Sequence, residues 1–205
     1  MTPFRQHWTY PENDPSILLF DHAVQAWAAL DLPQGARVLE LGCAETNFSH
    51  WLLKADPSIR LTGVDVNEVQ HYRGDLIRGA AEAQDFATSS FEAVILLGSL
   101  EHFGLGYYGD PVNEDADIET LLKIHDWLVP GGWVYYDVPW TPHRHYVTEN
   151  RHFRVYDDCT LPGCDGLVPK HRRYAHGRTN EPQPTRPEQP TTPFWYCARL
   201  LEKPA

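Results

Sequence analysis

Two short apolar segments, each carrying an acidic residue near its end, are the part of the chain best suited to ligand chemistry. The first, residues 38–41, carries Glu40 and leads through Gly42 into a helix-like segment, and the second, residues 61–66, carries Asp65. This order predicts a strand, a tight turn and a helix, in which Gly42 lets a ligand approach the backbone closely. In a nucleotide-binding βαβ unit, an acid placed like Asp65 accepts hydrogen bonds from the two ribose hydroxyls. Because Glu40 would repel a phosphate, the expected ligand presents hydroxyl or amine groups at the first strand.

These two segments resemble motif I, and the acidic strand end that follows it, of class I S-adenosylmethionine (SAM) methyltransferases. The family form of the motif is roughly E-x-G-x-G-x-G; Gly42 matches it, whereas Ala44 and Thr46 stand where glycines are usual. Residues 79–95 are similar to the family pattern G-D-A-x-x-x-P-F…S-F-D-x-V. Ala80 replaces the acid that in this family holds the adenine amino group.

Three further segments extend the resemblance. Residues 97–102 look like the family's exit from the fourth strand, and residues 128–133 closely resemble its L-K-P-G-G turn before the fifth strand. Residues 104–111, followed by His143, further resemble a poorly characterised subgroup of methyltransferase-like proteins. Membership of that subgroup would not identify an acceptor.

The resemblance implies that SAM is the cofactor, and it assigns the contacts residue by residue. Asp65 would bind the ribose, and backbone groups of Gly98 and Ser99 would contact the methionine amine. At the adenine, Glu82 or Asp85 would take the place of the missing acid. The full set of predicted cofactor-binding residues is Glu40, Gly42, Ala44, Asp65, Val66, Ala81, Glu82, Leu97, Gly98 and Ser99.

Three histidines are the predicted catalytic residues. A hydroxyl acceptor needs a base whose pKa lies near the working pH, and histidine meets that need. His102 follows the fourth expected strand, whereas His143 and His145 follow the fifth, so all three lie at the carboxyl edge where an acceptor must sit. The glycine-rich loop that contains residues 107–110 is expected to cover the acceptor, since such loops commonly carry binding residues.

Composition indicates a globular cytoplasmic protein. Hydrophobic residues make up 42% of the 205 residues, no apolar run approaches the roughly 20 residues of a membrane helix, and residues 1–10 lack the apolar core of a signal peptide. Four cysteines in a chain of this length do not make a disulfide framework, which fits the cytosol. The net charge of −11 disfavours nucleic acid as a partner, because only residues 170–173 form a basic cluster. We therefore expect a small-molecule acceptor and no membrane association.

Alternating strand and helix patterns predict an α/β fold with a doubly wound, mostly parallel, seven-stranded sheet and an antiparallel C-terminal hairpin. The expected helices cover residues 16–30, 47–55, 117–128 and 153–161. The expected strands cover residues 38–41, 60–66, 76–78, 91–98, 133–138, 166–175 and 194–202. All of these belong to one methyltransferase domain, residues 1–205, with an N-terminal arm at 1–15 and a Pro-rich loop at 177–193.

No metal site is predicted. The spacing of the potential zinc ligands is not the tight C-x-x-C form; these ligands are Cys159, Cys164, His171 and His176. A magnesium site at Asp110 and nearby acids, as in some sugar O-methyltransferases, is not indicated by the sequence.

The expected function is SAM-dependent methyl transfer to a small molecule, with O-methylation the first choice. The main alternative is a non-catalytic or degenerate SAM-binding protein of the same fold, which Ala80 and Thr46 favour. A dinucleotide-binding protein of the NAD type is disfavoured by the missing glycines and by Glu40, which would face a pyrophosphate.

Overall fold

The computed structural model describes residues 23, 26–28, 30–44, 48–70, 72–143, 145–158, 160–176, 182–183 and 195–205. Within these ranges the first half of the fold consists of β1 (Arg37–Leu41), α2 (Phe48–Ala55), β2 (Arg60–Asp65), β3 (Asp75–Arg78), β4 (Phe91–Leu96) and the short 3-10 helix η2 (Leu100–His102). The second half consists of α3 (Ala116–Trp127), β5 (Leu128–Trp140), β6 (Tyr146–Val147), β7 (Arg154–Val155), β8 (Val168–His176), β9 (Pro182–Gln183) and β10 (Trp195–Glu202).

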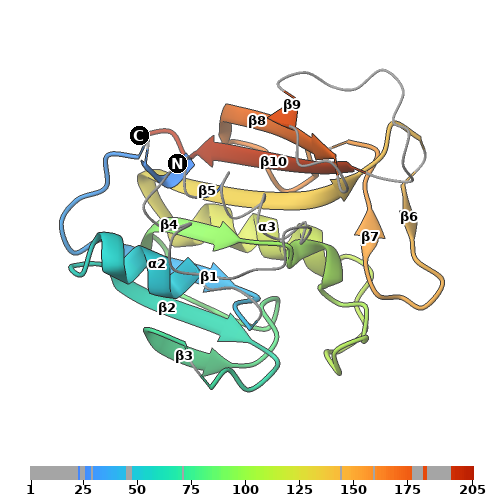
Figure 1. The fold of residues 1–205 in the computed structure, drawn as a ribbon, viewed down its shortest axis with the longest axis horizontal. Helices are drawn as coiled ribbons and strands as arrows, with labels where there is room; N and C mark the ends of the chain where they lie inside the picture. The colour runs from blue at the N-terminus through green and yellow to red at the C-terminus, as the bar shows by residue number, and fades with distance from the viewer. Residues whose placement is uncertain are drawn as a thin grey trace.

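One sheet organises these elements, with the strand order β3-β2-β1-β4-β5-β10-β8-β9 (Figure 1). The first five strands in this order are parallel, whereas β10 is antiparallel to both β5 and β8. The chain moves outward from β1 to β3 and then returns to place β4 on the other side of β1. This reversal is the kind of switch point at which doubly wound sheets bind ligands, outside the carboxyl ends of the strands.

Helices pack on both faces of the sheet because successive strand residues point to opposite sides. Val38 packs in a cluster that contains Phe48 and Leu52 of α2. Leu39 belongs to a second cluster that contains Leu121 of α3. Figure 1 shows α2 in front of the sheet and α3 behind it. The sheet is therefore the middle layer of three, and its central strands are buried on both sides.

The predicted fold class is confirmed, with small changes in the number and length of the strands. The sheet contains the seven expected strands and gains the two-residue β9, while β5 begins at Leu128 rather than Trp133. Of the helix expected at 16–30, the described residues 23 and 26–28 are helical, and the others except Leu30 lie outside the described residues. The expected arm at 1–15 lies wholly outside them, as does the loop at 177–193 apart from β9.

The helix expected at 153–161 is wrong. Arg154 and Val155 form β7, which pairs with β6, and Tyr156 makes an isolated parallel bridge to Trp140 at the end of β5. The described residues of this segment contain no helix. The segment is extended because Arg154 reaches inward, where its two terminal nitrogens donate to the carbonyl oxygens of Phe103 and Glu114 at 2.6 and 2.9 Å.

Candidate active site

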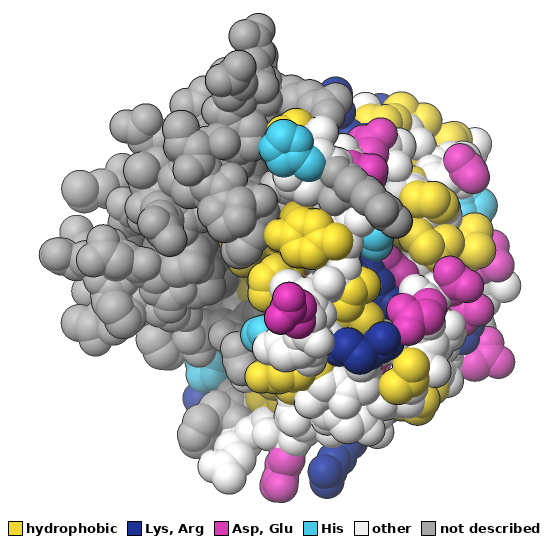
Figure 2. Space-filling model, turned by 90° about the vertical axis from the view of Figure 1, so that its right-hand side faces the viewer, with side chains coloured by type: hydrophobic (Ala, Val, Ile, Leu, Met, Phe, Trp, Pro, Cys, Tyr) yellow, Lys and Arg dark blue, Asp and Glu magenta, His cyan; other side chains and the backbone are white. Residues whose placement is uncertain are grey.

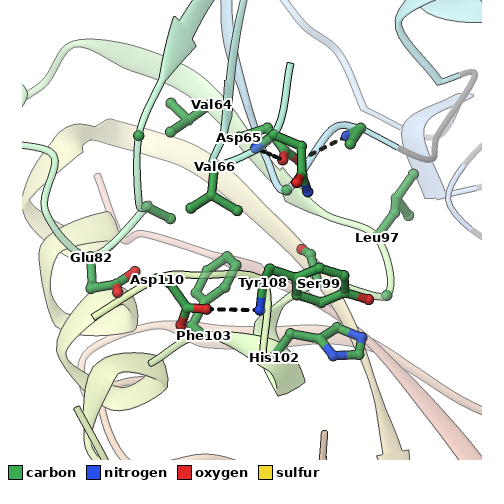
Figure 3. Close-up of a pocket in the computed structure, with 16 residues that line it drawn as sticks. Val64, Asp65, Val66, Glu82, Leu97, Ser99, His102, Phe103, Tyr108 and Asp110 are labelled. Carbon is green, nitrogen blue, oxygen red and sulfur yellow. Dashed lines mark hydrogen bonds between the residues drawn. The ribbon is translucent and has the colours of Figure 1, made fainter. Parts of the chain in front are cut away.

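A pocket opens at the carboxyl ends of the parallel strands, beside the point where the strand order reverses (Figure 3). Its volume is about 700 Å³ when the part that is open to solvent is included. Figure 2 looks onto this edge of the sheet, where hydrophobic side chains lie among acidic, basic and histidine side chains. The residues that line the pocket are Gly42, Ala44, Val64, Asp65, Val66, Asn67, Gly79, Ala81, Glu82, Leu97, Gly98, Ser99, His102, Phe103, Tyr108 and Asp110.

Most of the predicted site residues come together in this pocket. Every predicted cofactor-binding residue except Glu40 lines it, and so does His102 among the three predicted histidines. His143 and His145 are exposed and are not among the lining residues. Asp85 is also exposed and does not line the pocket. Of the two acids predicted to contact the adenine, Glu82 is therefore the one that lines the pocket.

The turn after β1 is held close to the exit of β4. Gly42 has φ of +72°, and a Cβ added to it would lie 2.4 Å from the Cβ of Ser99, so this position requires glycine. The Ser99 hydroxyl donates to the Leu41 carbonyl oxygen at 2.7 Å. The two loops therefore form one wall, in which the backbone stands close to the space that a ligand would fill. Thr46, which departs from the motif, lies outside the described residues.

Asp65 ends β2 at the pocket and fixes the loops on either side of it. One carboxylate oxygen accepts the Ala44 N–H and the other accepts the Asn67 N–H, each at 2.8 Å. The side chain is buried but faces the pocket, as Figure 3 shows. An ionised carboxylate with two backbone donors keeps lone pairs for ligand hydroxyls, because each of its oxygens can accept more than one hydrogen bond.

Gly98 is held from behind the pocket by a buried acid of β5. The Gly98 N–H donates to Oδ1 of Asp137 at 2.7 Å, and Gly98 has φ of +54°. Burial raises the pKa of Asp137 to about 7, with partly compensating hydrogen bonds from Gly98 and Tyr135. Glu101 is also buried, and its pKa is raised well above its usual value by burial and by the Asp137 charge. A pair of buried carboxyl groups therefore lies beneath the exit of β4.

Glu40 lies outside the pocket lining. It shares a face of β1 with Val38, which packs in the cluster of α2, and it is fully buried. Burial, followed by the charge of Glu40, raises the pKa of the neighbouring Tyr72 hydroxyl. Tyr72 packs against Gly63 of β2, where a Cβ would meet the Tyr72 ring at 2.4 Å. Glu40 therefore lies on the α2 side of β1, outside the pocket. Any effect of Glu40 on the cofactor would have to be transmitted through the turn after β1.

Two acids, Glu82 and Asp110, line one side of the pocket (Figure 3). Glu82 follows the third strand and Asp110 lies on the glycine-rich loop. Burial raises the pKa of Glu82, and the negative charge of Asp110 adds to this shift. Asp110 also accepts the N–H groups of Gly106 and Tyr108 at 3.1 and 3.3 Å, which closes the loop around its carboxylate.

His102 lines the pocket next to Tyr108. Its Nδ1 lies 2.5 Å from the carbonyl oxygen of His152. A carbonyl oxygen can only accept, so Nδ1 carries the hydrogen, and in the neutral ring Nε2 keeps its lone pair. Burial lowers the pKa of His102, which the carbonyl oxygen of His152 partly offsets. The ring is therefore a neutral base of fixed tautomer at the edge of the pocket.

Several lining residues were not predicted from the sequence. Val64 and Asn67 flank the predicted acid at the end of β2, and Gly79 belongs to a motif that the sequence already showed. Phe103 follows the predicted base directly. The carbonyl of His152 has no signal in the sequence, because its partner lies 50 residues earlier in the chain.

A family model described as a methyltransferase domain matches residues 17–167, which is well over half of the chain and contains every lining residue. The chain belongs to this family. As a class I methyltransferase it uses SAM as its cofactor, and the pocket fits that cofactor. Two features support this fit. Gly42 packs against Ser99 so closely that no other residue could stand at position 42, and the Asp65 carboxylate faces the pocket at the end of β2.

Solved structures show how widely this methyltransferase's fold is shared. The chain is similar to the Burkholderia thailandensis 1,6-didemethyltoxoflavin-N1-methyltransferase, solved with bound 1,6-didemethyltoxoflavin and S-adenosylhomocysteine, at 18% identity over 93% of this chain and 77% of that one, with a TM-score of 0.61. It is similar to the N-methyltransferase NodS of Bradyrhizobium japonicum, solved with S-adenosylhomocysteine, at 14% identity over 95% and 90% of the two chains, with a TM-score of 0.59.

A third similar structure, the [4+2]-cyclase SpnF, has 13% identity over 90% of this chain and 80% of that one, with a TM-score of 0.66. No curated protein sequence matches the methyltransferase. At these identities the solved structures establish the fold, and the choice of acceptor has to be argued from this chain's own residues.

The described residues of the methyltransferase contain no cluster of three or more His, Cys, Asp or Glu side chains that could hold a metal ion. Of the potential zinc ligands, Cys159 lies outside the described residues. Within those residues no helix is long and apolar enough to cross a membrane.

The pKa of Asp137 gives a prediction for the pH dependence of stability. The folded protein keeps a proton on Asp137 up to about pH 7, whereas the unfolded chain loses it near pH 4. The folded state therefore binds more protons in this window, and stability falls as pH rises from about 4 to 7. We expect Asp137→Asn to reduce the loss of unfolding free energy between pH 5 and pH 7.5 by about 2 kcal/mol, measured by urea denaturation.

The matched control for this experiment is Asp85→Asn, because the Asp85 side chain is exposed. Its pH dependence should equal that of the unsubstituted protein. A pH dependence that Asp137→Asn leaves unchanged would show that Asp137 is ionised in the folded state.

Proposed function

We propose that the methyltransferase transfers the methyl group of SAM to a hydroxyl oxygen of a small molecule. The observation that carries this proposal is His102, a neutral base whose Nδ1–H is committed to the His152 carbonyl oxygen at 2.5 Å. A hydroxyl must lose a proton as it attacks, and a base within reach of the pocket can take it. His102 is the predicted histidine that lines the pocket, which favours it over His143 and His145.

In the proposed complex the cofactor spans the pocket from the Asp65 end of β2 to the exit of β4. Asp65 would accept the ribose hydroxyls, the Gly98 backbone would face the methionine end, and Ala81 and Glu82 would face the adenine. When bound, SAM supplies a methyl group that is already electrophilic. What remains for the protein is to align the acceptor, to exclude water and to receive the acceptor's proton.

Charge supports a small molecule over nucleic acid as the acceptor. The chain has a net charge of −11, and the described lining residues include Asp65, Glu82 and Asp110 but neither lysine nor arginine. A phosphate backbone would be repelled from such a pocket. The N-methyltransferases of the same fold do not decide between oxygen and nitrogen here, because fold alone does not fix the acceptor atom.

The test combines a binding measurement with a product analysis. Calorimetric titration should show SAM binding, and a panel of small hydroxyl and amine compounds incubated with SAM should give acceptor-dependent S-adenosylhomocysteine and a methyl ether. Absence of SAM binding at millimolar concentration would refute the cofactor site. Products methylated only on nitrogen or carbon would refute the proposed O-methylation.

A further inference from the structure

A cluster of five aromatic rings stands at the mouth of the pocket and is left unexplained by cofactor binding. The cluster, called the ring platform below, consists of His102, Tyr107, Tyr108, His152 and Phe153. Its closest ring pairs are Tyr107 with His152, whose centroids are 4.2 Å apart, and His102 with His152 at 4.9 Å. Tyr108 stands edge-on to both His102 and Tyr107, at 5.4 and 5.0 Å.

Hydrogen bonds hold the ring platform in place. The Tyr108 hydroxyl and His152 Nε2 lie 3.1 Å apart in a hydrogen bond, and the Tyr108 N–H donates to Asp110. Behind the loop, Arg151 Nε donates to the Leu105 carbonyl oxygen at 3.2 Å, and the buried Arg154 donates to the Phe103 carbonyl oxygen. The rings are thus pre-organised before any ligand binds, which lowers the entropic cost of binding.

Despite these bonds the two tyrosines remain exposed. The exposed fraction is 48% for Tyr107 and 37% for Tyr108. Fixed aromatic rings that face a pocket and solvent offer stacking partners for another ring, at centroid distances of about 4.5–7 Å. Tyr108 and His102 are also lining residues, so an acceptor stacked here would lie beside the space proposed for the cofactor.

The charges around the ring platform exclude anions. Asp110 and Glu82 contribute carboxylates to the adjoining pocket wall, and the described lining residues contain no cationic side chain to balance them. The neighbouring cations have partners of their own. Lys123 Nζ donates to the carbonyl oxygens of Glu82 and Gln84 at 2.6 and 3.2 Å, Arg151 pairs with the Glu114 carboxylate at 2.8 Å, and the buried Arg154 donates to backbone carbonyl oxygens. A carboxylate or phosphate on the acceptor would lose its hydration without gaining a partner.

The lowered pKa of His102 limits the kinds of hydroxyl group that it can deprotonate. Because burial lowers the pKa of His102, the ring is a weaker base than free histidine. A phenolic hydroxyl, like that of tyrosine, has a pKa of about 10, whereas an aliphatic hydroxyl is close to water at about 15.7. A weak base can therefore assist the deprotonation of a phenol effectively and that of an aliphatic alcohol poorly.

We infer that the ring platform binds an uncharged planar aromatic ring and presents its phenol-type hydroxyl to His102. The methylation of this hydroxyl rests on the proposed O-methylation, whereas the binding of the aromatic ring does not depend on it. In the reaction, the phenolic oxygen forms a bond to the methyl carbon of SAM while the bond between that carbon and the SAM sulfur breaks. The electron pair of that bond stays on sulfur, and the phenolic proton passes to Nε2 of His102.

Three matched probes test the inference without any turnover. 2-Naphthol is planar and neutral, 2-naphthoate has the same rings with a negative charge, and trans-2-decalol is a saturated bicyclic alcohol. We expect calorimetric titration into the protein saturated with S-adenosylhomocysteine to show 2-naphthol binding at least about ten-fold more tightly than either of the others. Equal binding of the three, or preference for 2-naphthoate, would overturn the inference.

Substitutions then locate the site. Tyr108→Leu should weaken 2-naphthol binding about ten-fold, whereas Tyr146→Leu, at a tyrosine 40% exposed on β6, should leave it unchanged. Tyr108→Phe keeps the ring and should retain most of the affinity even though it loses the bond to His152. A cooperative unfolding transition and retained binding of S-adenosylhomocysteine show that each variant is folded. An unaltered affinity of Tyr108→Leu for 2-naphthol would refute the platform.

The binding and the reaction can fail separately. Selective binding of 2-naphthol without its methyl ether ever forming would refute the proposed O-methylation and leave the ring platform standing. Methylation of aliphatic alcohols by a protein that does not prefer 2-naphthol would refute the ring platform and leave the proposed O-methylation standing.

Discussion

Replacing Asp65 with Asn should lower the affinity for SAM by about ten-fold to a hundred-fold. The carboxylate accepts the Ala44 and Asn67 N–H groups at 2.8 Å each, so both oxygens are needed as acceptors before any ligand binds. An amide offers one acceptor oxygen, and its NH₂ would face a backbone N–H. The substitution therefore weakens the proposed ribose contact and loosens the loop after β1 at the same time. Calorimetric titration with SAM measures the effect.

Asp85→Asn is the matched control, because Asp85 is an exposed acid that does not line the pocket. It should bind SAM as the unsubstituted protein does. If the two variants had the same affinity, the cofactor would have to bind elsewhere. A lower affinity of Asp85→Asn alone would instead assign the adenine contact to Asp85, which was one of the two choices that the sequence left open.

The parts of the fold that the sequence predicted are those determined locally. The strand at 91–96 is apolar apart from Glu92, as expected of a strand that is buried on both faces. Gly42 and Asp65 lie in a strand–turn–helix pattern whose geometry follows from the chain nearby. Once those strands are parallel neighbours, their carboxyl ends meet at one edge, and the lining residues Leu97, Gly98 and Ser99 follow without further information.

The parts that the sequence missed depend on contacts between distant segments. Arg154 lies in a stretch with an apparently helical pattern, but it is buried and donates to the carbonyl oxygens of Phe103 and Glu114, and tertiary contacts of this kind override local propensity. The sequence places His102, His143 and His145 near the same edge with equal weight. The structure separates them, because His102 lines the pocket and its Nδ1 contacts the His152 carbonyl oxygen, 50 residues away, whereas the other two lie outside the lining.

Replacing His102 with Gln should reduce kcat by about 100-fold to 10,000-fold once an acceptor is known, while the affinity for SAM stays nearly constant. Glutamine can still donate to the His152 carbonyl oxygen, but it has no lone pair that is basic near neutral pH. The loss should therefore fall on the proton transfer and not on binding. Turnover under saturating SAM and acceptor measures kcat, and calorimetry measures the binding.

The pH profile separates a base from a merely structural residue. Since burial lowers the pKa of His102, the ring stays neutral to more acidic pH than free histidine does, and the acidic limb of kcat should have its midpoint below about 6.5. In His102→Gln that limb should disappear. His143→Gln and His145→Gln are the matched controls, because both histidines are exposed and outside the pocket lining, and they should keep the full rate and the acidic limb. If one of these controls lost activity while His102→Gln kept it, the base would lie after β5, and the acceptor would have to approach from that side of the sheet edge.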